Sequence, residues 1–177
     1  MVTAVRLWFA ALAASSIAAL ACGNPVHDAT VDALGPENPN VPPGPLHRPG
    51  QPCLACHGGE GPASLQFSVG GTVYAVRGQS RPAIGPCVQI EDIEGRYWTS
   101  APTNTVGNFF VNESDFAPNF PIRMALVSCE TGAIFQQMQT LAARDGSCAD
   151  CHSSPASPTS AGLVYLAVDE PDDGGTP

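Results

Sequence analysis

The stretch from residue 69 to residue 111, VGGTVYAVRGQSRPAIGPCVQIEDIEGRYWTSAPTNTVGNFFV, alternates β-branched and aromatic residues with polar ones. Gly and Pro residues interrupt it at short intervals, which is typical of strands joined by turns. Working outward, the same pattern predicts strands at residues 67–76, 87–93, 96–100, 108–111, 122–128 and 162–168. The sequence therefore predicts a mainly β fold, a small β-sandwich.

The strand expected at residues 122–128 indicates which side faces the core. Side chains of a strand alternate between its two faces. Ile122, Met124 and Leu126 therefore share one face, and Arg123 and Ala125 share the other. We expect the first face, Met124 included, to be buried in the core.

The N-terminal segment has the features of an exported protein. Arg6 precedes an apolar run over residues 7–21, which is too short for a stable membrane span and is typical of a signal peptide. Ala-Leu-Ala directly before Cys22 resembles the lipobox of bacterial lipoproteins. We expect Cys22 to carry the lipid, with simple cleavage as the alternative. Because no Asp follows Cys22, the resemblance implies the outer membrane.

The pentapeptide C-x-x-C-H occurs twice, at residues 53–57 and 148–152. In this pattern two thiols add across the vinyl groups of one haem, and the adjacent histidine becomes an axial ligand of the iron. We therefore expect two covalently bound c-type haems, held by Cys53, Cys56, His57, Cys148, Cys151 and His152.

Two other uses of the cysteines are possible. A zinc site with four cysteines would explain both pairs, but it does not require a histidine after each pair. A thioredoxin-like dithiol needs a helix behind its cysteines. Gly-Gly follows the first motif and Ser-Ser-Pro the second, and neither favours a helix.

The sixth ligand of each iron decides between electron transfer and ligand chemistry. His47 precedes the first motif in a Pro-rich segment that could fold over the haem, so it is a candidate, with a solvated linker histidine as the alternative. His27 lies farther toward the N-terminus, and we expect it to be solvated.

One short helix is expected at residues 134–143, where Ile134, Met138 and Leu141 recur at helical spacing before the second motif. From there the Met138 thioether could reach the second iron and raise its potential. The alternative is that Met138 only packs with its apolar neighbours. Both interpretations stay open.

The number of cysteines suggests one disulfide. The lipid and the two haem motifs account for all seven except Cys87 and Cys129. Both lie at strand positions of an exported chain, so we expect a Cys87–Cys129 disulfide, with two buried free thiols as the alternative.

The region from residue 69 to residue 111 resembles the carboxypeptidase regulatory-like domain, a transthyretin-like or prealbumin-like sandwich. The matching residues are Gly71, Val73, Tyr74, Val88, Ile90, Asp92, Gly95, Thr99, Thr103, Gly107 and Phe109. The resemblance implies an Ig-like or prealbumin-like β-sandwich with the haem-binding segments on both sides. It implies a scaffold and no catalytic residues.

These patterns divide the chain into four parts. They are a signal peptide (1–21), a lipid-anchored Pro-rich linker (22–52), a haem-bearing β-sandwich domain (53–168) and an acidic disordered tail (169–177). The linker is expected to be extended, because proline interrupts it repeatedly.

Charge limits the possible partners. Acidic residues outnumber basic ones by 16 to 7, so nucleic acid is not expected to bind. The expected partner is a redox protein, such as another cytochrome, and the membrane is reached through the lipid. We expect an electron carrier and not an enzyme. The alternatives are a binding or assembly lipoprotein of a larger cytochrome complex and a small haem peroxidase, which would need an open haem face.

Overall fold

The computed structural model describes residues 24–167. The expected signal peptide, Cys22 and the acidic tail lie outside the described residues. The helices are α2 (Pro25–Ala33), α3 (Cys53–His57) and α4 (Cys148–Cys151). The strands are β1 (Phe67–Val76), β2 (Cys87–Glu91), β3 (Tyr97–Thr99), β4 (Asn108–Asn112), β5 (Arg123–Val127), β6 (Ile134–Gln137) and β7 (Val164–Ala167).

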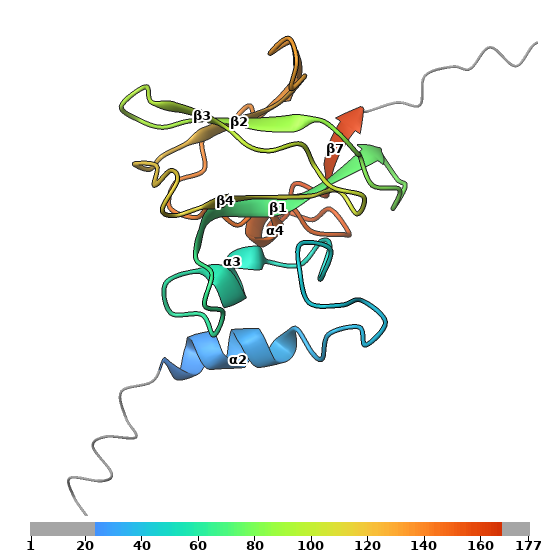
Figure 1. Cartoon of the computed structure of the whole chain (residues 1–177), viewed down its shortest axis with the longest axis vertical. Coiled ribbons are helices and arrows are strands. Elements are labelled where there is room, and N and C mark those ends of the chain that lie inside the picture. The colour runs from blue at the N-terminus through green and yellow to red at the C-terminus, as the bar shows by residue number, and fades with distance from the viewer. Residues whose placement is uncertain (1–23, 168–177) are drawn as a thin grey trace, which may run out of the picture.

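The strands form two sheets, one with the order β4-β1-β7 and one with the order β3-β2-β5-β6. Figure 1 shows the sheets as two layers, with α3 and α2 below the layer that contains β1 and β4. Both sheets contribute to one buried cluster, which includes Val69, Val73, Val88, Ile90, Phe109, Val111, Ile122, Met124 and Leu126. The fold is therefore mainly β with few helices, consistent with a small β-sandwich.

The strand pattern read from the sequence is confirmed at six places. Strand β1 occupies the expected residues, and β2, β3, β4, β5 and β7 differ from expectation only at their ends. Ile122, Met124 and Leu126 are at most 8% exposed, which confirms the face expected to be core. Ala125 on the other face is also buried, because it packs with Cys87 and Val127 in a second, smaller cluster.

The prediction of a helix at residues 134–143 is wrong. The segment begins with β6, which pairs antiparallel with β5. The pairing continues past β6, since the Met138 N–H donates to the Met124 carbonyl at 2.9 Å. Ile134 is 56% exposed, so its apolar spacing does not mark a buried helical face. Pairing with β5 satisfies the backbone hydrogen-bonding groups of this segment, whereas a short isolated helix is only marginally stable.

The expected extended linker is partly structured. Helix α2 begins after Asn24, whose side chain accepts a hydrogen bond from the His27 N–H, and Pro25 occupies the first helical position. At the other end, the Arg48 guanidinium donates to the carbonyls of Leu34 and Gly35. This arginine bonds to the carbonyls just past the end of the helix and ties that end to the segment before α3. Of the helices in residues 24–167, none is long and apolar enough to cross a membrane.

Asp92 organises the turn between β2 and β3. Its carboxylate accepts hydrogen bonds from the backbone N–H groups of Glu94, Arg96 and Asn119 and pairs with the Arg96 guanidinium at 2.6 Å. Burial opposes ionisation, but the hydrogen bonds outweigh it and lower the pKa of Asp92 below its usual value. Gly95 supplies the positive φ that the turn needs.

Candidate functional site

The first C-x-x-C-H motif forms a single helical turn, α3, between Pro52 and Gly58. Residues three apart on a helix lie on the same side, so Cys53 and Cys56 face one way. Both thiols are free, and both residues line a cavity of about 290 Å³ beside the outer face of β1 and β4. The motif thus presents its two sulfur atoms to one enclosed space.

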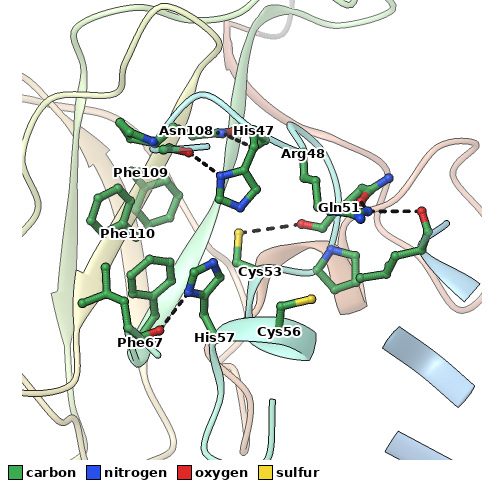
Figure 2. A pocket seen from close by; sticks show the side chains of 15 residues that line it. His47, Arg48, Gln51, Cys53, Cys56, His57, Phe67, Asn108, Phe109 and Phe110 are labelled. Carbon is green, nitrogen blue, oxygen red and sulfur yellow. Dashed lines mark hydrogen bonds between the residues drawn. The ribbon is translucent and has the colours of Figure 1, made fainter. Parts of the chain in front are cut away.

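The same cavity brings His47 and His57 together. Their ring centroids are 5.7 Å apart and the ring planes differ by 36°. Figure 2 shows one nitrogen of each ring turned toward the space between them, next to Cys53. His47 comes from the segment before α3 and His57 from the end of α3. His47, the candidate for the sixth ligand, therefore lies close to His57, the predicted axial ligand of the first motif.

A backbone carbonyl accepts a hydrogen bond from the other nitrogen of each ring. The Nδ1 of His57 lies 2.8 Å from the Leu65 carbonyl oxygen, and the Nδ1 of His47 contacts the Gly44 carbonyl. A neutral ring that donates from Nδ1 keeps Nε2 free as an acceptor or metal ligand. Metal-binding histidines almost always have such a partner on the second nitrogen. Both rings therefore leave Nε2 available for another partner.

Aromatic and aliphatic side chains make the cavity largely apolar. The His57 ring stacks on Phe67 with centroids 4.2 Å apart, and Phe67 stacks on Phe110 at 4.6 Å. Leu34 and Leu65 also line the cavity. Such walls exclude water and suit a flat apolar cofactor.

The second motif forms the short helix α4, followed by His152. Cys148 is buried and Cys151 exposed, and both thiols are free. The Nδ1 of His152 lies 2.9 Å from the Gly162 carbonyl oxygen, which leaves its Nε2 free as at His57. Burial, together with a hydrogen bond that the protonated group donates to Asp145 and the charge of Asp145, raises the pKa of Asp150 within the motif to about 6.

Two glycines of β1 bring the motifs close together. A Cβ atom on Gly70 would lie 3.1 Å from the Cys53 Cβ, and one on Gly71 would lie 2.6 Å from the Cβ and Sγ of Cys148. Successive residues of a strand point to opposite faces. The motifs therefore approach β1 from its two sides at neighbouring positions, and only glycine leaves room for both cysteines.

The protonation of the thiols and the grouping of possible ligands bear on the thioredoxin-like and zinc alternatives. Burial raises the pKa of Cys53 to about 11 and that of Cys148 to about 12, so both are protonated at neutral pH. A thioredoxin-like dithiol needs a lowered pKa, and this argues against that alternative. Within residues 24–167, no three His, Cys, Asp or Glu side chains are grouped as a metal site of protein ligands requires.

The remaining candidates are the Cys87–Cys129 pair, Met138 and His27. The Cys87–Cys129 disulfide is confirmed, with Cα atoms 5.1 Å apart. Met138 is partly buried against the core, which favours the packing interpretation over the ligand. His27 is in the first turn of α2, and its Nε2 is buried without a hydrogen-bond partner among the described residues, contrary to the expected solvation. It does not line the cavity.

Four residues that line the cavity or bond to its lining were not predicted from the sequence, namely Thr72, Asn108, Phe67 and Phe110. Strand alternation offered a signal for Phe110, because its neighbours Phe109 and Val111 are core residues and it must point outward. An outward aromatic residue is a hint that something covers that face.

Comparison of the chain with models of known families, with curated proteins and with solved structures finds no match.

Proposed function

We propose that this protein is an exported dihaem c-type cytochrome that transfers electrons outside the cytoplasm. One observation carries the proposal: His47 and His57 face each other across an apolar cavity that Cys53 and Cys56 also line. The Cys22 lipid would anchor the chain in the outer membrane, and a second haem would be held by Cys148, Cys151 and His152.

The donor set at the cavity fits a haem. Metal–imidazole bonds are about 2 Å long, so two of them on opposite sides of one metal span about 4 Å. The ring centroids are 5.7 Å apart, so the two rings would have to move slightly apart to bind one metal between them. The cysteines would hold the macrocycle through thioethers, and Phe67 and Leu65 would exclude water. When bound, a haem supplies one-electron redox chemistry.

The opposed histidines favour electron transfer over catalysis. A peroxidase needs one open axial position where substrate can bind. If His47 and His57 both held the iron, no position would stay open for substrate. Imidazoles held by the carbonyls of Gly44 and Leu65 would need to move little if a bound iron changed its oxidation state. This supports a carrier and not an enzyme.

The rest of the chain suits this function. The net charge of −9 keeps the protein soluble and favours a redox partner with a basic surface. We further propose that the two sheets are a prealbumin-like scaffold, in keeping with the resemblance in the sequence. That scaffold holds the motifs on either side of β1.

Haem content and spin state test the proposal. The full chain made with a cytochrome c maturation system should contain two covalent haems by pyridine haemochrome analysis. Changing Cys53 and Cys56 together to Ala should halve this number, as should the same change at Cys148 and Cys151. A colourless product, or one that binds zinc in place of haem, would overturn the proposal.

His47→Ala tests the sixth ligand. It should convert one ferric haem from low spin to high spin and allow carbon monoxide to bind it after reduction. His27→Ala is the matched control, because this histidine does not line the cavity, and it should leave the spectrum unchanged. A wild-type protein that already has a high-spin haem at the first motif and turns over peroxide would favour the enzymatic alternative.

A further inference from the structure

A pair of buried polar residues lies beneath the loop that carries His47. Thr72 of β1 and Asn108 of β4 are directly paired across the sheet. Only 6% of Thr72 and 9% of Asn108 is exposed. The Thr72 Oγ1 donates to the Asn108 Oδ1 at 2.7 Å. Their neighbours Val73 and Phe109 belong to the core, so the polar pair faces the opposite side of the sheet.

The loop covers this pair and is bonded to it on both sides of His47. The Gly50 N–H donates to the Thr72 Oγ1 at 2.7 Å. The Asn108 Nδ2 donates to the carbonyl oxygens of Pro45 at 3.2 Å and His47 at 3.0 Å. The backbone of His47 is therefore fixed directly and through its two flanks.

The burial of these polar groups would be unfavourable without the loop. Buried amides and hydroxyls lose their bonds to water and destabilise the fold unless other partners replace them. Here the loop both covers the pair and supplies the replacements, so release of the loop would break three hydrogen bonds and expose the pair to water. The pair and the loop consequently stabilise one position for His47.

We infer that Thr72 and Asn108 are positioning residues that hold His47 over the cavity and so keep the sixth coordination site of the first haem closed. The inference rests on the proposed function and deepens it. Both side chains act through the backbone of residues 45–50, to which they are hydrogen-bonded. The sheet thereby determines the ligand state of the haem.

Thr72→Val in the full haem-loaded chain tests the inference, because it removes the hydroxyl and keeps the shape. Loss of one or two buried hydrogen bonds shifts an equilibrium about 5- to 30-fold. We expect a rise of this size in the rate of carbon monoxide binding to the reduced protein, with a growing high-spin fraction in the ferric spectrum. Thr72→Ser restores the hydroxyl and should restore both readouts.

Ser100→Ala is the matched control. Ser100 is also buried, and its Oγ accepts from the Val88 N–H at 2.9 Å and donates to the Ala101 carbonyl at 2.7 Å, in the other sheet. Its loss should lower thermal stability and leave the spin state unchanged. A protein that keeps two haems but shows the same carbon monoxide kinetics in Thr72→Val as in Ser100→Ala would overturn the inference and leave the proposed function standing.

A second variant serves if Thr72→Val does not fold. The Asn104 side chain donates from Nδ2 to the Pro45 carbonyl at 2.7 Å, while its Oδ1 accepts from the N–H groups of Val106 and Asn108. Asn104→Asp keeps the Oδ1 acceptor and replaces the donor to the loop with a carboxylate oxygen. We expect a smaller rise in carbon monoxide binding than for Thr72→Val. An unchanged rate in this variant would count against positioning by the sheet. A product without haem would instead refute the proposed function.

Discussion

Removal of the Cys87–Cys129 disulfide should lower the stability of the domain strongly without changing its haem content. The bond closes a loop with a sequence separation of 42 residues. In the chain-entropy model a loop of this length is worth about 4 kcal/mol at 25 °C. Small domains are stable by only about 5–15 kcal/mol, so this bond is a large share of the total.

Thermal unfolding of the Cys87→Ala/Cys129→Ala double variant is the assay. For a domain of this size about 4 kcal/mol corresponds to a fall in Tm of about 10–25 °C. Cys87 packs with Ala125 and Val127, so the alanine also removes some packing. Wild-type protein treated with a thiol reductant is the control, because it keeps both sulfur atoms while thioether links to haem are not reduced.

Haem content should stay at two in both samples. The disulfide belongs to the four-stranded sheet, whereas the cavity lies on the outer face of the three-stranded one. A change in Tm below about 3 °C in both samples would refute the entropy argument for this loop. Loss of haem from the folded variant would show that the scaffold and the cofactor site are not independent.

Two further predictions concern residues singled out by the sequence. Met138→Leu conserves volume and should cost less than about 1.5 kcal/mol with an unchanged haem spectrum, since Met138 packs against the core; a new high-spin haem, measured by ferric absorption, would show instead that the thioether is a ligand. Cys22→Ser should move the mature protein from the membrane to the soluble fraction, measured by blotting of fractions, and unchanged fractionation would count against lipidation.

The sequence alone predicted six of the strands and the disulfide, and it indicated the residues for which we propose haem chemistry. Strand alternation is local, so the core face of β5 could be read directly from residues such as Met124. The two C-x-x-C-H motifs are also local, because thioether attachment requires a fixed spacing along the chain. The disulfide followed from the number of cysteines.

The tertiary structure decided everything that depends on pairing between distant segments. Residues 134–137 form an edge strand because β5 offers backbone partners, which helical spacing in the sequence could not show. The motifs meet across Gly70 and Gly71 because β1 passes between them, whereas in the chain they are far apart. His47 faces His57 because the loop over residues 45–50 bonds to Thr72 and Asn108. Buried polar groups must find partners, and only the folded chain determines which ones are within reach.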